Sequence, residues 1–288
     1  MYCARANKLR VFNNMSALTR PRLRGGRAIN LQRRSSKRRR VDVKYEDEGS
    51  SRDSQMDKVW KPDDWRAQFD NIVAMRRERD APVDKMGAEK QAGADLSPKV
   101  SRFHVLVSLM LSSQTKDQVT DAAMTNLRDR GLTIENILTM EESEIGDLIY
   151  PVGFWKRKAQ YLKKTCAILR DQYDSDIPRT VKELCQLPGV GPKMAHLTMN
   201  IAWKEPCGIG VDTHVHRISN RLGWVKSPTT TPEQTRVELE SWLPRKHWIE
   251  INLLLVGFGQ QTCLPVSPKC RQCLNNSTCP FGRKETKR

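Results

Sequence analysis

Hydrophobic residues recur at helical spacing from about residue 58 onward. Phe103, Leu106, Leu109 and Met110 fall at positions i, i+3, i+6 and i+7, which places them on one face of a helix rather than on alternate sides of a strand. The same spacing recurs in further sets: Ile137, Ile145, Leu148 and Ile149; Leu162, Ile168 and Leu169; Val211, Val215, Ile218 and Leu222. Turn signals separate segments of about 8–16 residues, a usual helix length. With no competing strand pattern or fixed-period repeat, the sequence predicts an all-α fold.

Residues 1–57 lack this periodicity. They are basic, then mixed in charge and rich in Ser, and they cannot bury enough apolar surface to offset the entropy of ordering, so we expect a disordered tail. The Arg-rich, acid-free residues 1–34 are typical of a mitochondrial transit segment, and residues 33–40 are typical of a nuclear-localisation cluster. These signals predict location in the nucleus and the mitochondrion. The alternative is a solvated basic arm that adds non-specific affinity for phosphate.

The positive charge of the chain is concentrated in this tail. The sequence has 50 Lys and Arg residues against 33 Asp and Glu residues, a net charge of +17. Residues 1–40 hold 13 of the basic residues and no acidic one, so the remaining 248 residues carry a net charge of only +4. Charge alone therefore does not identify a nucleic-acid enzyme. No apolar run approaches the ~20 residues that span a bilayer, and we expect no membrane partner.

Four of the eight cysteines stand close together near the C-terminus. They are Cys263, Cys270, Cys273 and Cys279, with the spacing C-x6-C-x2-C-x5-C. Arg5, Lys8 and Arg10 interrupt any secretory-type apolar stretch, so disulfides are not expected and close-set cysteines indicate a metal. One C-x2-C pair flanked by two single cysteines suits a [4Fe–4S] cluster. Zinc is the alternative, because spacing alone does not identify a metal, and four free buried thiols are a third.

Residues 187–193, Leu-Pro-Gly-Val-Gly-Pro-Lys, form the most specific segment of the chain. The preceding helical pattern must end at Pro188-Gly189, and Pro192 suits the first turn of a new helix, where its missing N–H is not needed. The two glycines permit positive φ and a close approach of the backbone to a partner. We therefore expect two helices joined by a tight loop, in which Gly189, Val190 and Gly191 bind an anion such as a DNA phosphate.

Lys193 lies at the mouth of this loop, nineteen residues before Asp212. A helix from Pro192 to about Trp203 would run ~17 Å. The segment 204–210 would span ~23 Å when extended, enough to bring Asp212 back beside the helix start. The two side chains would then form a catalytic amine–carboxylate pair. The alternatives are a phosphate contact or solvent exposure for Lys193, and a helix N-cap for Asp212.

The hairpin with its lysine, the segment 211–214 (Val-Asp-Thr-His) and the cysteine spacing together resemble the endonuclease III family of helix-hairpin-helix DNA glycosylases, and most of all its eukaryotic members. The resemblance covers residues 58–283. It implies a six-helix barrel domain over 96–205 and an iron–sulfur domain formed by 58–95 and 206–283, with 284–288 as a short tail. The catalytic cleft would lie between the two domains.

The resemblance also implies roles for single residues. Lys193 would be the nucleophile and Asp212 its carboxylate partner. Gln114 falls where the family inserts a side chain into the gap left by an extruded nucleotide, and Phe154 falls at the second wedge position, where bacterial members often have a smaller aliphatic residue. Packing is the alternative for both. Leu109 stands where adenine-mismatch glycosylases carry a catalytic glutamate, and thymine-mismatch relatives carry a tyrosine at the position of Lys193. The lysine therefore favours the lyase-competent branch.

The implied activity is that of a bifunctional DNA N-glycosylase and abasic-site lyase that removes oxidised pyrimidines during base excision repair. Its partner would be damaged double-stranded DNA, bound by a monomer, with downstream repair proteins as further partners. Lys269 and Arg271, inside the cysteine segment, would contact phosphates, with ordinary surface charge as the alternative. The rival function is a module of the same fold that binds lesions or abasic sites without catalysis.

Overall fold

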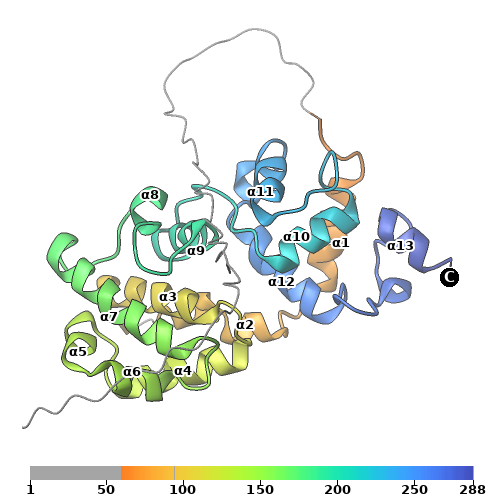
Figure 1. Ribbon diagram of the computed structural model, residues 1–288. Coiled ribbons are helices and arrows are strands. Elements are labelled where there is room, and N and C mark those ends of the chain that lie inside the picture. Colours follow the sequence, from red (N-terminus) through yellow and green to blue (C-terminus); the bar gives the residue numbers. More distant parts are fainter. Residues whose placement is uncertain (1–59, 94, 288) are drawn as a thin grey trace, which may run out of the picture. The chain divides into compact units, whose positions relative to one another are not determined.

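Helices make up the regular structure in a computed structural model that describes residues 60–93 and 95–287 (Figure 1). The α-helices are α1 (Trp65–Met75), α2 (Pro82–Met86), α3 (Pro98–Ser112), α4 (Asp117–Asp129), α5 (Ile134–Thr139), α6 (Glu142–Ile149), α7 (Trp155–Gln172), α8 (Val181–Leu184), α9 (Pro192–Thr198), α10 (Thr213–Leu222), α11 (Pro232–Glu240), α12 (Glu250–Gln261) and α13 (Pro280–Glu285). Three 3-10 turns, η1 (Ala88–Gln91), η3 (Arg245–His247) and η4 (Cys270–Gln272), and one π-helical turn, η2 (Met199–Trp203), complete the set.

The prediction of an all-α fold is confirmed, since no strand occurs in 60–93 or 95–287. In the same part of the chain, no helix is both long and apolar enough to cross a membrane. The tail predicted for residues 1–57 and its targeting signals lie outside the described residues.

The first hydrophobic cluster is built around α3. This helix begins at Ser97, whose hydroxyl accepts a hydrogen bond from the Val100 amide, and every residue from Phe103 to Leu111 is buried. A helix that is apolar on all sides belongs in the middle of a domain, and α3 packs against α4, α7, α9 and η2. The cluster draws its residues from Phe103 to Met199 and includes Leu106, Met124 and Leu162.

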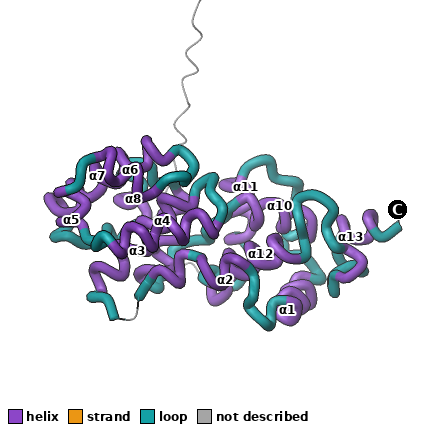
Figure 2. The backbone as a smooth tube through the Cα atoms, turned by 90° about the horizontal axis from the view of Figure 1, so that it is seen from below, coloured by secondary structure: helices purple, strands orange, loops and turns teal. Residues whose placement is uncertain are grey.

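A second hydrophobic cluster combines the start of the described chain with its end. It joins Phe69 and Ile72 of α1 to residues between Ile209 and Cys279, most of them on α10 and α12. Figures 1 and 2 show the corresponding helices as two groups, with α2 between them. The domain division and boundaries expected from the resemblance stay a prediction.

A buried ion pair holds α1, α2 and α12 together. The side chain of Arg76, at the end of α1, is 1% exposed and pairs with Asp84 of α2, which is 5% exposed. Arg76 also donates to Gln261 Oε1 at 2.6 Å. A Cβ at Gly257 of α12 would lie 2.1 Å from the Arg76 guanidinium, so this glycine makes room for the pair.

Gln260, which precedes Gln261 on α12, extends the joint between α1, α2 and α12 to α4. The Val83 amide donates to Gln260 Oε1 at 3.1 Å, and Gln260 Nε2 donates to Asp117 Oδ2 at 2.7 Å. Because α4 packs in the first cluster and α12 in the second, these contacts fix how the two groups of helices meet.

Arg76→Met is expected to lower the free energy of unfolding by about 3–5 kcal/mol, because it leaves the Asp84 carboxylate buried without a counter-charge. Urea unfolding followed by circular dichroism measures this loss. The double variant Arg76→Met/Asp84→Leu, which removes both charges, should recover a large part of it. An unchanged urea midpoint in Arg76→Met would show that the pair does not stabilise the joint.

Candidate active site

The hairpin loop between α8 and α9 is held in place by its apolar residues and its glycines. Leu187 and Val190 are buried in the first cluster. Gly189 has φ +79°, and a Cβ there would lie 2.5 Å from the ring of Tyr161, so both the backbone conformation and the packing require glycine. Gly191 is the N-cap of α9, and nothing lies within 4 Å of the position its Cβ would take. One side of the loop is therefore packed against the rest of the protein, and the backbone at Gly191 is open to a partner.

Lys193 and Asp212 line the same cleft. Lys193 lies half-buried in the first turn of α9, next to Pro192, and Asp212 precedes α10. The cleft has a volume of about 500 Å³, within the range of small-molecule sites. The segment between the pair thus folds back as expected, although α9 ends at Thr198 and continues as the π-helical turn η2 to Trp203. The amine and the carboxylate face one space.

Asp212 is both an N-cap and a member of this cleft. Its Oδ1 accepts from the amides of His214 and Val215, each at 2.9 Å, which caps α10. Burial disfavours the ionised carboxylate, but the hydrogen bonds from His214 and Val215 and the positive charge of Lys193 outweigh it and hold the pKa of Asp212 below its usual value. The side chain is therefore an ionised carboxylate at neutral pH.

His214 has no role predicted from the sequence. Its Nδ1 lies 2.9 Å from Asp212 Oδ2, the oxygen that the helix amides leave free. Because an ionised carboxylate only accepts, Nδ1 is the donor in this hydrogen bond. His214 also lines the cleft. Its position two residues after a helix N-cap was the signal in the sequence, since that spacing lets the ring fold back onto the carboxylate.

The walls of the cleft are mostly apolar, with a few acidic side chains. Leu109 and Leu197 supply apolar surface, and Leu109 is 5% exposed. Glu89 and Asp117 also line the cleft, and sequence reasoning did not assign either of them to it. Asp117 is bonded to Gln260, as described above, which places its carboxylate in the joint between the helices.

Gln114 and Phe154 are exposed, and both have left-handed backbones. Gln114 follows α3 with φ 52° and lines the cleft. Phe154 precedes α7 with φ 57°, and it is 66% exposed. The alternative that Phe154 serves packing does not hold, because its ring is not buried. The role of the two side chains as wedges stays a prediction.

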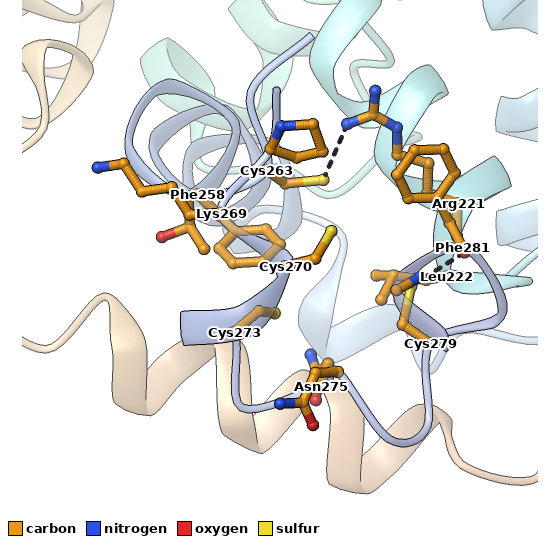
Figure 3. A pocket seen from close by; sticks show the side chains of 14 residues that line it. Arg221, Leu222, Phe258, Cys263, Lys269, Cys270, Cys273, Asn275, Cys279 and Phe281 are labelled. Atoms are coloured by element: carbon orange, nitrogen blue, oxygen red, sulfur yellow. Dashed lines mark hydrogen bonds between the residues drawn. The ribbon is translucent and has the colours of Figure 1, made fainter. Parts of the chain in front are cut away.

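The four clustered cysteines line a second pocket (Figure 3). Cys263 lies in the loop after α12, and Cys270 begins η4. Cys273 follows η4, and Cys279 is the N-cap of α13. Phe258 and Phe281 form apolar walls around them. Without a bound metal, burial raises the pKa of the Cys273 thiol to about 11 and also raises the pKa values of the Cys270 and Cys279 thiols.

Arg221 fastens one side of this pocket. Its Nη1 lies 3.4 Å from Cys263 Sγ and donates to the Leu264 carbonyl at 2.7 Å, while Nη2 donates to the Pro265 carbonyl at 3.0 Å. Asn275 ties the far side to α1 by donating to the Gln68 carbonyl at 3.0 Å. A cation beside sulfur atoms suits thiolates rather than neutral thiols.

The geometry of the four sulfurs bears on the kind of metal group. Within 60–93 and 95–287, no three His, Cys, Asp or Glu side chains are arranged to hold a metal ion. A single zinc ion would need its sulfurs about 2.3 Å from one point. Thiols that surround a shared pocket suit a larger group whose corners each take one thiolate, as an iron–sulfur cube does.

Lys269 and Arg271 are exposed on the segment that carries η4. The Lys269 amide donates to the Thr262 carbonyl at 2.9 Å, which fixes the backbone while the side chain faces solvent. Neither residue lines the cleft of Lys193. Their contact with phosphate stays a prediction.

Comparison with known proteins gives consistent matches. Residues 107–245 match the family described as HhH-GPD superfamily base excision DNA repair protein. The chain is 57% identical to endonuclease III-like protein 1 of Gallus gallus, over 90% of this chain and 92% of that one. It is 48% identical to the endonuclease III homolog of Schizosaccharomyces pombe, over 78% and 64% of the two chains.

Solved structures agree with the sequence matches. A trapped endonuclease III–DNA covalent intermediate superposes with a TM-score of 0.67 at 27% identity, covering 77% of this chain and 97% of that one. A non-covalent endonuclease III–DNA complex gives a TM-score of 0.66 at 27% identity, over 78% and 97%.

Substitution of Asp212 separates its capping role from its charge. Asp212→Ala should lower the free energy of unfolding by about 0.5–2 kcal/mol, as for other lost N-caps. Asp212→Asn should cost less, because asparagine caps as well as aspartate. Urea unfolding at several pH values measures both.

The pH dependence gives the sign of the charge effect. Because folding lowers the pKa of Asp212, its charge stabilises the protein above the unfolded value of about 3.9, and this contribution is lost as the pH falls through the folded pKa. The difference between wild type and Asp212→Asn should therefore shrink on acidification. Equal losses for Asn and Ala at neutral pH would contradict the capping role.

Proposed function

The chain belongs to the endonuclease III family within the HhH-GPD superfamily of base excision DNA repair proteins, and from this premise we propose that it is a bifunctional DNA glycosylase and abasic-site lyase. The observation that carries the proposal is the shared cleft of Lys193 and the ionised Asp212. A glycosylase that only activates water would need no amine there. The lysine adds the lyase step, because a primary amine can form a Schiff base with the opened sugar.

Damaged double-stranded DNA is the partner. The hairpin amides around Gly191 bind a backbone phosphate and set the position of the duplex without reading its sequence. A base inside a duplex shields its own C1′, so the nucleotide must leave the stack, at a cost of a few kcal/mol that is smallest for damaged bases. Gln114 and Phe154 fill the gap that it leaves. Lys269 and Arg271 add phosphate contacts from the cysteine segment.

The chemistry begins with the neutral amine of Lys193. Its nitrogen bonds to C1′ while the C1′–N bond to the base breaks, and the base leaves with the electron pair and takes up a proton. Ring opening gives an iminium, which acidifies the C2′ proton. Removal of that proton gives an enamine with a C1′–C2′ double bond. Its electrons then form a C2′–C3′ double bond and restore the iminium while the C3′–O bond breaks, so the phosphate leaves and the strand is cut 3′ to the lesion. Water then releases Lys193.

Asp212 acts on the charge that develops during this sequence. Its carboxylate stabilises the oxocarbenium-like sugar or accepts a proton, and its hydrogen bond from His214 orients the oxygen that α10 does not use. The capping bonds fix the other oxygen. A carboxylate held in this way needs no rearrangement when the sugar becomes positive.

The cysteine pocket would hold a [4Fe–4S] cluster. Cys263, Cys270, Cys273 and Cys279 would each bind one corner as thiolates, with Arg221 beside the first of them. When bound, the cluster cross-links the loops and supplies no electron to the reaction above. It shapes the segment that carries Lys269 and Arg271.

The substrates that we propose are oxidised or ring-saturated pyrimidines, removed by a monomer. The basic residues 1–40 direct the protein to the nucleus and the mitochondrion.

Borohydride should trap a covalent adduct between the wild-type protein and abasic DNA, because it reduces the Schiff base to a stable amine. Lys193→Gln should abolish the adduct on a denaturing gel, whereas Lys204→Gln, at an exposed lysine beyond η2, should retain it. Adduct formation by Lys193→Gln at wild-type yield would exclude Lys193 as the nucleophile. Tight abasic-site binding by wild type without any adduct or cleavage would favour the non-catalytic module.

The purified protein should be yellow-brown, with about four iron atoms per chain and matching sulfide. Cys273→Ser should lose the colour, because it removes one ligand. Cys207→Ser is the matched control, since Cys207 is exposed and outside the pocket. A colourless protein that contains stoichiometric zinc would rule out the cluster.

A further inference from the structure

A buried lysine lies where the Gln114 loop meets the turn before α7. Lys158 of α7 is only 7% exposed. Its Nζ donates to the carbonyls of Leu111 and Ser113, each at 2.7 Å, and lies 3.4 Å from Thr115 Oγ1. None of the three acceptors is a carboxylate. Burial lowers the pKa of Lys158 to about 8, because removing the ammonium from water costs free energy. An apolar side chain would fill the same space without this desolvation cost.

The acceptors lie at the C-terminal end of α3. Leu111 is in the last turn of this helix and Ser113 is its C-cap. The last carbonyls of a helix have no partner within it and carry partial negative charge, which favours a cation. Lys158 therefore caps α3 from a different helix, at the point where the chain turns toward Gln114.

Thr115 and Gly153 connect this cap to the second loop. Thr115 Oγ1 donates to the Ser113 carbonyl at 3.2 Å and accepts from the Gly153 amide at 3.1 Å. A Cβ at Gly153 would lie 2.6 Å from the Gln114 carbonyl oxygen, so the two backbones touch. The segments 113–115 and 153–154 thus form one braced unit, with Lys158 beneath it.

The two exposed residues on this unit are both strained. Gln114 (φ 52°) and Phe154 (φ 57°) are non-glycine residues in the left-handed region, a conformation that persists only where the surroundings impose it. The hydrogen bonds of Lys158 and Thr115 hold the neighbouring residues Ser113 and Gly153 in place. Their effect is to hold two side chains out from the surface at a fixed spacing.

We propose that Lys158 is a positioning residue for extrusion of the damaged nucleotide: its ammonium locks the two loops together, so that Gln114 and Phe154 enter the duplex as one preformed wedge. The inference rests on the proposed function, because it gives the wedge a substrate. A rigid wedge loses little conformational freedom on insertion, so more of the binding free energy is available to unstack the base.

The test compares a step that needs the wedge with one that does not. Lys158→Met keeps the length and apolar stem of the side chain and removes its charge. Lys163→Met is the matched control, because Lys163 lies on the same helix and its Nζ donates to the Met140 carbonyl, away from both loops. The two substrates are a ring-saturated pyrimidine in duplex DNA and an abasic site in single-stranded DNA.

For Lys158→Met, kcat on the duplex lesion should fall by about tenfold or more with little change in KM, since extrusion follows binding. Borohydride trapping on the single strand should stay at the wild-type yield. The fluorescence rise of 2-aminopurine beside the lesion, which reports unstacking, should be lost. Lys163→Met should match wild type in all three measurements.

A second pair of variants covers the case in which Lys158→Met does not fold. Thr115→Val keeps the shape of the side chain but loses the acceptor for the Gly153 amide, and Thr115→Ser keeps the hydroxyl. The valine variant should show the same split between substrates, and the serine variant should restore duplex cleavage.

Two outcomes would overturn the inference. One is duplex cleavage and 2-aminopurine fluorescence at wild-type level in both Lys158→Met and Thr115→Val. The other is an equal loss on the two substrates, which indicates a general structural role. Failure of the wild-type protein itself to form an adduct on abasic DNA, both single-stranded and duplex, would count against the proposed function instead.

Discussion

The arrangement of the cleft depends on one carboxylate that is held by a helix end. Asp212 accepts two amide hydrogen bonds that cap α10, and the same group faces Lys193. Two bonds to the helix and one from His214 leave its oxygens little freedom, so the position of the charge follows the position of α10. Since α10 packs in the second hydrophobic cluster and the helix of Lys193 in the first, the geometry of the pair also depends on the joint at Arg76 and Gln260.

Helix ends serve as binding groups at several places in this protein. The start of α9 leaves the hairpin amides for an anion, and the end of α3 binds the ammonium of Lys158. At the start of α13, the Gly282 amide lies 3.3 Å from Cys279 Sγ, which favours a thiolate ligand. In each case the unsatisfied amides or carbonyls of a helix end meet a charged or polarisable group. The fold therefore obtains its functional sites from the same backbone groups that any helix must satisfy.

Local patterns in the sequence predicted the helices and the groups of residues that come together. They could not predict hydrogen bonds between residues far apart in the sequence. The helical period, Pro192 and the cysteine spacing all act over a few residues, and the expectations drawn from them agree with α9 and the shared cysteine pocket. Lys158 contacts a carbonyl 47 residues away, and in the sequence it is one lysine among several on α7. Its burial follows from how α7 packs on α3. The exposure of Phe154 depends on the same contact between α7 and α3. The sequence alone therefore could not decide between a wedge role and a core-packing role for Phe154.

The two sites lie at opposite ends of one helix, α10. Asp212 caps its first turn, and Arg221 in its last turn binds the loop of Cys263, while the Arg221 carbonyl lies 3.2 Å from Cys279 Sγ. The helix has ten residues and spans about 15 Å, so both sites are fixed to one short rigid rod. Both the cysteine loops and the carboxylate are therefore hydrogen-bonded to the same helix. The cysteine pocket and the Lys193–Asp212 pair therefore share one structural support, even though no step of the proposed chemistry passes through the metal group.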